Sequence, residues 1–261
     1  MKVVVITGGS SGIGRAAARL FRDRGWRVFE LSRRESEEEG VTHLACDVTD
    51  RSSVREALKA VWEAEKRIDL LVNNAGMGIS GPVEFASEED VRRQFDVNFF
   101  GALAVTQETI PFMREGKGGT ILFVTSVAAP IAIPFQAFYS ASKSALQSLS
   151  LSLRNELAPF GIKVASILPG DTKTGFTDAR KKGIAGEEVY GDAMTRSVAT
   201  MEHDEKNGRS PESVARVIWR AGTARNPRPW YTVGASYKVL VFLERILPAR
   251  LVRAIVGKLY A

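Results

Sequence analysis

Residues 7–14 read Thr7-Gly8-Gly9-Ser10-Ser11-Gly12-Ile13-Gly14, and this glycine-rich stretch decides the fold. It follows an apolar run at residues 3–6 that is typical of a buried strand, and it leads into a helical pattern. A strand that turns sharply into a helix facing a pyrophosphate needs glycines, because side chains would block the approach. Glycines also serve ordinary tight turns. The position of this loop at the start of a strand–helix–strand pattern favours dinucleotide binding.

Beyond this loop, short β-branched runs alternate with longer helical stretches. The strand-like runs are residues 27–31, 41–45, 69–72, 120–125, 162–168 and 230–233. The helical stretches are residues 12–24, 51–66, 88–113 and 138–159. Strands that alternate with helices of this length predict a parallel sheet covered on both faces. We therefore expect an α/β fold, a Rossmann-like doubly wound parallel sheet of about seven strands.

Composition excludes several classes of protein. The chain has 261 residues, of which 44% are hydrophobic and 25% charged, so disorder, collagen and coiled coil are excluded. One cysteine and two histidines exclude an internal disulfide framework and predict no metal site. The net charge of +6 comes from scattered basic residues without a reader motif, so we expect no nucleic-acid partner. No apolar run suits a spanning helix or a secretory signal, which predicts a cytoplasmic protein.

Two regions depart from the alternating pattern of a single domain at residues 1–235. Residues 171–210 are polar, rich in glycine and without a strand-like run, and we expect them to form a lid over the substrate. Phe176, Tyr190 and Met194 are the candidate pocket residues in this lid. Residues 236–261 have apolar faces at helical spacing, interleaved with basic residues. This C-terminal amphipathic extension is expected to cover the domain or a neighbouring subunit, or to lie on an anionic membrane surface.

The end of the second expected strand bears on the choice of dinucleotide. It reads Glu30-Leu31-Ser32-Arg33-Arg34, and the two guanidinium groups suit a 2′-phosphate. NAD sites usually carry an acid there. The alternative interpretation is a solvated loop whose arginines pair with the acids that follow, namely Glu35, Glu37, Glu38 and Glu39, and Glu30 is a further acid nearby. We expect NADP, with NAD as the alternative.

Four polar residues are candidates for catalysis. Tyr139 and Lys143 stand four residues apart and share one face of an expected helix. An adjacent ammonium would lower the pKa of the phenol from ~10 toward neutrality, although such pairs also occur by chance on helix surfaces. Ser126 follows a strand at the sheet edge where open α/β folds bind ligands. Asn98 is an amide in the middle of an expected helix, where it needs a partner.

Together these motifs resemble the short-chain dehydrogenase/reductase family, in its compact single-domain form. The matching pieces, in the order of the family, are Thr7-Gly8-x-x-x-Gly12-x-Gly14, Asp47, Asn73-Asn74-Ala75-Gly76, Asn98, Ser126, Tyr139-x-x-x-Lys143 and Pro169-Gly170. Each motif alone is weakly specific, and the ordered set, which covers residues 1–233, is strongly specific. The resemblance implies an oxidoreductase that transfers hydride between NADP(H) and a carbonyl or alcohol, in a homodimer or homotetramer.

The resemblance also implies a role for each matching residue. Tyr139 would protonate the carbonyl oxygen, and Ser126 would orient it. Lys143 would bind the nicotinamide ribose and lower the pKa of Tyr139, while Asn98 would hold a water that links Lys143 to solvent. The residues expected at the cofactor are Gly8, Ser10, Ser11, Gly12, Ile13, Gly14, Ser32, Arg33, Arg34, Asp47, Val48, Asn74, Ala75, Gly76, Tyr139, Lys143, Pro169, Gly170, Thr172 and Thr174. Some NADP-dependent members carry a basic residue where this chain has Ser11. Arg33 would therefore carry more of the discrimination between NADP and NAD, and use of both dinucleotides stays open.

The apolar stretch at residues 127–135 joins two of the catalytic candidates. This position predicts a hydrophobic ketone or aldehyde as substrate, of the steroid, retinoid or acyl type. The alternative is that Ile131, Ile133 and Phe135 pack into the core or an interface. Two other functions stay open: a redox sensor that binds the dinucleotide without turnover, and a nucleotide-sugar epimerase or dehydratase. An intact Tyr/Lys pair disfavours the sensor, and the short chain disfavours the epimerase.

Overall fold

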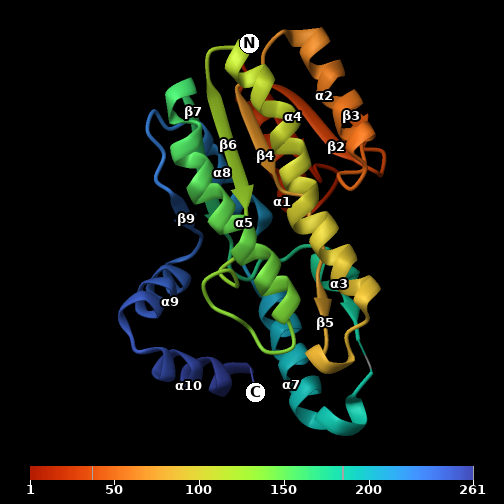
Figure 1. The fold of residues 1–261 in the computed structure, drawn as a ribbon, viewed down its shortest axis with the longest axis vertical. Coiled ribbons are helices and arrows are strands. Elements are labelled where there is room, and N and C mark those ends of the chain that lie inside the picture. Colours follow the sequence, from red (N-terminus) through yellow and green to blue (C-terminus); the bar gives the residue numbers. More distant parts are fainter. Residues whose placement is uncertain (37, 184, 261) are drawn as a thin grey trace.

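The computed structural model describes residues 1–36, 38–183 and 185–260, and its core is a seven-stranded parallel sheet (Figure 1). The strands lie in the order β3-β2-β1-β4-β6-β7-β9. Their bounds are β1 Val3–Thr7, β2 Arg27–Ser32, β3 Val41–Ala45, β4 Leu70–Asn73, β6 Gly119–Val124, β7 Ile162–Leu168 and β9 Trp230–Thr232. The order reverses between β1 and β4, which is the switch point where such sheets bind ligands. The predicted doubly wound fold of about seven strands is confirmed.

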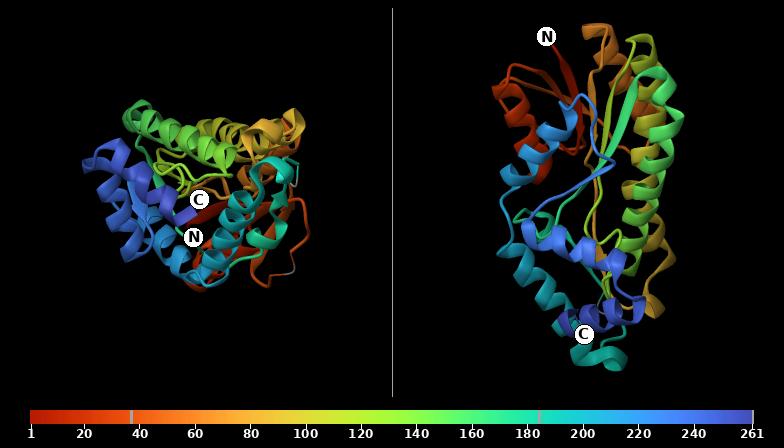
Figure 2. Two further views of the ribbon diagram at one scale, coloured as in Figure 1. Left: turned by 90° about the horizontal axis from the view of Figure 1, so that it is seen from below. Right: turned by 90° about the vertical axis from the view of Figure 1, so that its left-hand side faces the viewer.

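Helices cover both faces of the sheet, as the second view in Figure 2 shows. The helices α1 (Gly12–Asp23) and α8 (Pro211–Gly222) pack on one face, with Phe21 and Ile218 fully buried there. The opposite face carries α2 (Arg51–Glu65), α4 (Ala102–Glu115) and α5 (Ala137–Glu156). The continuous apolar runs of the central strands follow from burial on both faces. In the described part of the chain, no helix has both the length and the apolar character that crossing a membrane requires.

Further elements gather beyond the carboxyl ends of the strands (Figure 1). The segment expected to form a lid contains α6 (Phe176–Ala179), α7 (Glu187–Lys206) and also a short strand β8 (Lys181–Lys182). This strand pairs in parallel with β5 (Ile79–Ser80), so the expectation that residues 171–210 lack a strand is wrong. Two residues are too few to show a periodic pattern, and the pairing is formed only in the tertiary structure. The C-terminal residues form α9 (Ala235–Ile246) and α10 (Ala249–Tyr260), and α10 packs against α7.

The stretch at residues 88–113 is not one continuous helix. It consists of α3 (Glu88–Phe95), the π-helical turn η2 (Asp96–Gly101) and the start of α4. Within this turn the buried side chain of Asn98 binds the backbone of Met77, and single π-turns inside helices often mark functional sites. Two 3₁₀ turns, η1 (Val83–Phe85) and η3 (Ala158–Phe160), complete the described elements.

Candidate active site

The glycine loop between β1 and α1 has the conformation that its sequence predicts. Gly8 and Gly12 have positive φ values of 66° and 52°, which favour glycine. A Cβ atom at Gly14 would lie 2.2 Å from the carbonyl oxygen of Gly8, so Gly14 allows the helix to pack closely on the loop. Gly14 is buried and does not line the cavity, in contrast to the other glycines of the motif. Its role is therefore to shape the loop.

The loop and the N-terminus of α1 open into a cavity of about 440 Å³. Ser11 is the N-cap residue, but its side chain makes no capping hydrogen bond, and the first turn of α1 contains no acidic residue. Free N–H groups and the positive end of the helix dipole therefore face this cavity. This arrangement binds a phosphate or pyrophosphate, and with the glycine cradle it fits a dinucleotide.

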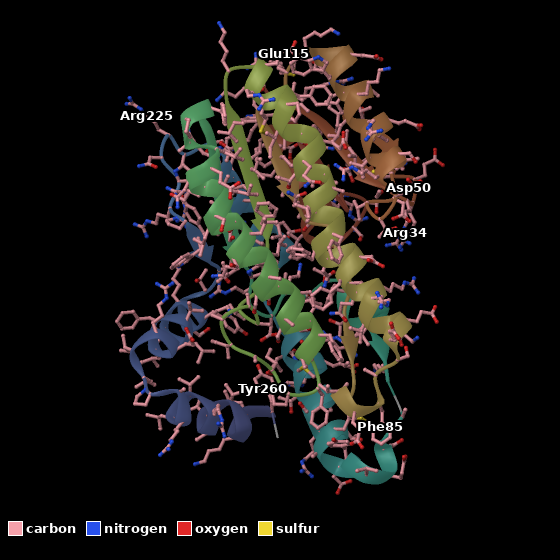
Figure 3. The ribbon with its side chains drawn as sticks, in the orientation of Figure 1. Arg34, Asp50, Phe85, Glu115, Arg225 and Tyr260 are labelled. Atoms are coloured by element: carbon pink, nitrogen blue, oxygen red, sulfur yellow. The ribbon has the colours of Figure 1, made fainter. Side chains whose placement is uncertain are left out.

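At the far end of β2, two arginines line the same cavity and the neighbouring acid does not. Glu30 is fully buried, and its carboxylate contacts His43 and accepts a hydrogen bond from Ser32 Oγ at 3.2 Å. Arg33 and Arg34 are exposed at the cavity (Figure 3 labels Arg34). Arg33 Nη1 lies 3.8 Å from Asp47 Oδ2. This end of the cavity thus offers two exposed guanidinium groups to a ligand.

Of the acids that follow the arginines, Glu38 has partners other than Arg33 and Arg34. Glu38 pairs with Arg19 at 2.7 Å and with Arg22 at 3.1 Å, both on α1. These two arginines hold the pKa of Glu38 below its usual value, mainly through the hydrogen bond from Arg19. Glu37 lies outside the described residues.

Tyr139 and Lys143 lie on α5 and line the cavity with Ser126, which follows β6. Lys143 Nζ donates to the carbonyl oxygen of Val124 at 3.0 Å and lies 5.8 Å from the centre of the Tyr139 ring. Burial lowers the pKa of Lys143 to about 8. Burial raises the pKa of Tyr139 to about 12, and a hydrogen bond with Ser126 acts in the opposite direction. Desolvation of the phenolate is thus the largest influence on this pKa, and the expected lowering of the pKa of Tyr139 by Lys143 stays a prediction.

Asn98 lies behind the cavity and does not line it. Its Oδ1 accepts from the Met77 backbone N–H at 2.8 Å. Its Nδ2 donates to the Met77 carbonyl at 3.0 Å and to Ser142 Oγ at 3.1 Å. Asn98 thereby fixes the segment after β4 against α5, the helix that carries Tyr139. The water-binding role implied for Asn98 stays a prediction.

The other predicted site residues meet in the one cavity, although they come from separate strand ends. Those that line it are Gly8, Ser10, Ser11, Gly12, Ile13, Ser32, Arg33, Arg34, Asp47, Val48, Asn74, Ala75, Gly76, Ser126, Tyr139, Lys143, Pro169, Gly170, Thr172 and Thr174. Of the predicted catalytic and cofactor-binding residues, only Gly14 and Asn98 do not line the cavity, and both lie directly behind its wall. The dinucleotide-binding role of each residue stays a prediction.

The substrate side of the cavity differs in part from expectation. Phe176 lines it, with its ring 5.8 Å from that of Tyr139. Tyr190 lies outside it, 37% exposed, with its hydroxyl bonded to Glu84, and Met194 is buried in α7 away from the cavity. A helix presents only one face to a cavity, and the sequence does not show which face of α7 this is.

The apolar stretch after Ser126 divides between the two alternatives. Ile131 and Ile133 line the cavity, and Ile131 also packs in a small apolar cluster with Val241 of α9 and Val256 of α10. Phe135 does neither: it lies against the ring of Tyr190, with a positive φ of 58°. Ile131 therefore fits both interpretations, Ile133 fits the pocket, and Phe135 fits neither.

Several residues that sequence reasoning missed also line the cavity. Asp171 follows the Pro169-Gly170 pair and accepts a hydrogen bond from Tyr237. Burial is the main cause that raises the pKa of Asp171. Glu205 of α7 lines the cavity and forms an ion pair with the buried Arg180. Asp171 could have been suspected from its place after a strand end, whereas nothing in the sequence signals Glu205.

The C-terminal helices complete the wall of the cavity. The lining residues from this region are Tyr237, Leu240, Val256, Leu259 and Tyr260. Figure 3 shows Tyr260 near the end of the chain, below α5. Burial raises the pKa of Tyr260 to about 12, as does the negative charge of nearby acids. The described part of the C-terminal extension, residues 236–260, therefore contributes to the wall of the cavity.

Comparison with known proteins identifies the family. The short chain dehydrogenase family model matches residues 2–185, and the chain belongs to this family. The chain is 40% identical over 242 residues to the 3-ketodihydrosphingosine reductase of Bacteroides thetaiotaomicron, covering 92% of this chain and 90% of that protein. It is 30% identical over 274 residues to the NADPH-dependent 3-dehydrocapnine reductase of Ornithobacterium rhinotracheale, covering 99% and 97%.

A solved structure agrees with this assignment. The crystal structure of a short-chain dehydrogenase from Streptomyces avermitilis superimposes with a TM-score of 0.84 at 28% identity, covering 98% of this chain and 95% of that one. The protein is thus an oxidoreductase of the short-chain dehydrogenase/reductase type with a Rossmann-like fold that binds nucleotides.

Proposed function

We propose that this protein is an NADP(H)-dependent reductase of a hydrophobic ketone. One observation carries the proposal: Ser126, Tyr139 and Lys143 line the same cavity as the glycine loop. A carbonyl placed beside the two hydroxyl groups would thus stand within the same space as a dinucleotide on the loop. The complete catalytic set favours turnover over a sensor that binds the dinucleotide without reaction.

The chain's own residues polarise and protonate the substrate. NADPH, when bound, supplies the hydride. The Ser126 and Tyr139 hydroxyl groups donate hydrogen bonds to the carbonyl oxygen, and Tyr139 gives up its proton as negative charge develops there. With a pKa of about 12, the phenol is protonated at neutral pH and ready to act as the acid. The Lys143 ammonium stabilises the phenolate that is left.

The proposed preference for NADP rests on the end of β2. Arg33 and Arg34 are exposed at the cavity and suit a 2′-phosphate. Glu30, the nearest acid on the strand, is buried with His43 and Ser32 and does not line the cavity. It is therefore poorly placed to accept hydrogen bonds from ribose hydroxyls. One relative is NADPH-dependent by name, which supports the same choice.

The proposed substrate is a long-chain ketone that carries an amino group. The 3-ketodihydrosphingosine named for one relative is such an amino ketone. The cavity combines apolar side chains, such as Leu240, Val256 and Leu259, with the two carboxylates of Asp171 and Glu205. The apolar wall suits an alkyl chain, and the Asp171 carboxylate suits an ammonium group next to the ketone, whereas Glu205 is already paired with Arg180.

We also propose a homodimer, supported by the exposed apolar residues Phe100 of η2 and Leu151 of α5, two elements that pack against each other. The cytoplasmic location stays a prediction from the sequence.

The proposed function is tested by NADPH oxidation with 3-ketodihydrosphingosine as substrate. Replacing Tyr139 with Phe removes the proton donor and is expected to lower kcat by roughly 10²–10⁴-fold, with NADPH affinity retained. Tyr190→Phe is the matched control, because Tyr190 lies outside the cavity. Turnover that survives in Tyr139→Phe would contradict the mechanism.

The amino group is tested separately with two ketones of equal chain length, one with the 2-amino group and one without. Asp171→Asn is expected to raise KM for the amino ketone by about tenfold, from the loss of a charge-assisted hydrogen bond of about 1.5 kcal/mol. The ketone without the amine is expected to be unaffected. Asp178→Asn is the control, an exposed acid in α6 that does not line the cavity. Equal effects of Asp171→Asn on both ketones would remove Asp171 from substrate recognition.

A further inference from the structure

The outer face of the two C-terminal helices exposes an unusual amount of apolar surface. The exposed apolar side chains of α9 are Val239, Phe242 and Ile246, with 57%, 60% and 59% of their surface accessible. Those of α10 are Leu251 and Leu259, with 48% and 52% accessible. We call these five residues the tail patch; the helices α9 and α10 that carry them lie at the lower left in Figure 1. Large exposed apolar patches mark interaction sites.

The tail patch is not needed to hold the two helices on the domain. Their inner faces do this: Val241 and Val256 are buried against Ile131, with Leu240 and Val252 packed beside them. The two faces therefore have separate roles, one in packing and one open to solvent. An amphipathic helix that keeps a second apolar face needs another apolar phase to cover it.

The charges on the same helices are almost all positive. The basic residues are Lys238, Arg245, Arg250, Arg253 and Lys258, all exposed, and the one acid is Glu244. Among the described residues, none of these five basic side chains forms an ion pair. Arg245 stacks on the Trp230 ring at 4.0 Å, which leaves its charge uncompensated. Exposed apolar groups among unpaired cations complement an anionic lipid surface.

We propose that α9 and α10 dock the protein on an anionic membrane surface through the tail patch. A second copy of the chain fits this face less well, because a two-fold interface would bring the same positive charges together. Basic side chains at a bilayer surface instead meet lipid phosphates, while the apolar side chains enter the interface.

The docked orientation also connects the bilayer with the substrate cavity. Leu259 belongs to the tail patch and lines the cavity as well, next to Tyr260. The cavity therefore reaches the surface at the helices that meet the membrane. A lipophilic ketone can pass along α10 from the bilayer to Tyr139 without crossing water. This last step rests on the proposed function, whereas membrane binding does not.

Vesicle co-sedimentation of the full-length protein tests the docking. The vesicles are phosphatidylcholine alone, or a 3:1 mixture of phosphatidylcholine with phosphatidylglycerol. We expect binding to the anionic vesicles only, weakened by added salt. The double variant Phe242→Asp/Ile246→Asp is expected to bind at least about tenfold more weakly. The double variant Arg250→Glu/Arg253→Glu is expected to bind the anionic vesicles at least about fivefold more weakly for each residue changed.

The matched control is Phe160→Asp in η3, just before β7 at the amino-terminal edge of the sheet. Phe160 is 43% exposed and lies outside the tail patch, so this variant is expected to bind vesicles normally. Failure of the unmodified protein to bind anionic vesicles would overturn the proposal. Unchanged binding in both tail variants would overturn it as well. Dissociation of an oligomer by the Phe242→Asp/Ile246→Asp variant, measured by light scattering without any vesicle binding, would assign the face to a second copy.

A kinetic comparison separates docking from catalysis. With a short, water-soluble ketone the Phe242→Asp/Ile246→Asp variant is expected to keep its activity, because neither residue lines the cavity. With a long-chain ketone carried in anionic vesicles its rate is expected to fall at least about fivefold. Equal rates of this variant and the unmodified protein in the vesicle assay would refute the proposed path of the substrate from the bilayer to the cavity. Absence of all turnover with intact vesicle binding would refute the proposed function and leave the docking surface in place.

Discussion

Replacement of Arg33 and Arg34 by Ala tests which dinucleotide the site prefers. Both guanidinium groups line the cavity at the end of β2, where the 2′-phosphate of NADPH is expected. NADH lacks this phosphate, so the two guanidinium groups do not strengthen its binding. The variants should therefore weaken NADPH binding and leave NADH binding nearly unchanged.

The size of the effect follows from the surroundings of Arg33. A charge-assisted hydrogen bond contributes roughly 1.5–3 kcal/mol. The Arg33 side chain is 66% exposed and already lies 3.8 Å from Asp47, so solvent and a competing partner reduce the gain. For Arg33→Ala we expect a loss of about 1.5 kcal/mol in the free energy of NADPH binding, which is about a tenfold rise in Kd. The double variant Arg33→Ala/Arg34→Ala should reach about a hundredfold if the two contributions add.

The assay is fluorescence titration of both reduced dinucleotides at fixed salt, because surface charges are screened. Arg19→Ala is the matched control: it removes one positive charge from α1, where Arg19 pairs with Glu38 at 2.7 Å and does not line the cavity. Its affinity for NADPH should stay within about twofold. Equal losses for NADPH and NADH in the Arg33 and Arg34 variants would refute the reasoning and place the 2′-phosphate elsewhere.

Three further predictions concern the glycine loop, the catalytic lysine and the buried amide. Gly14→Ala would put a Cβ atom 2.2 Å from the Gly8 carbonyl oxygen. We therefore expect the unfolding free energy to fall by about 1–3 kcal/mol and dinucleotide binding to weaken, as measured by denaturation and by ligand titration. The control is Gly257→Ala, because nothing lies within 4 Å of a Cβ atom at that position. Burial lowers the pKa of Lys143 to about 8, while Tyr139 stays protonated up to about 12. We therefore expect kcat/KM for ketone reduction to be level below pH 8 and to fall above it, because Lys143 loses its proton there. A flat profile to pH 10 would contradict this prediction. Asn98→Ala would leave the half-buried N–H and carbonyl of Met77 without their side-chain partner. We expect it to lower the unfolding free energy by about 1–3 kcal/mol, a loss that denaturant titration would detect.

The sequence by itself determined the features that depend on local pattern. Continuous apolar runs, without alternation of polar and apolar residues, identified the strands, because a parallel sheet buries both faces of its central strands. Glycines at positions 8, 12 and 14 identified the loop, since positive φ and close packing exclude side chains there. Ser126, Tyr139 and Lys143 were found because they stand at a strand end and at helical spacing.

Only the tertiary structure decided features that depend on contacts between distant segments. Asp171, Glu205 and Tyr260 come together in one cavity because α7 and α10 pack over the carboxyl edge of the sheet. The raised pKa of Tyr139 follows from burial, which the spacing to Lys143 could not reveal. The direction in which each face of α9 and α10 points is likewise set by packing: both faces are apolar in sequence, and only contact with Ile131 determines which one is buried and which one meets the solvent.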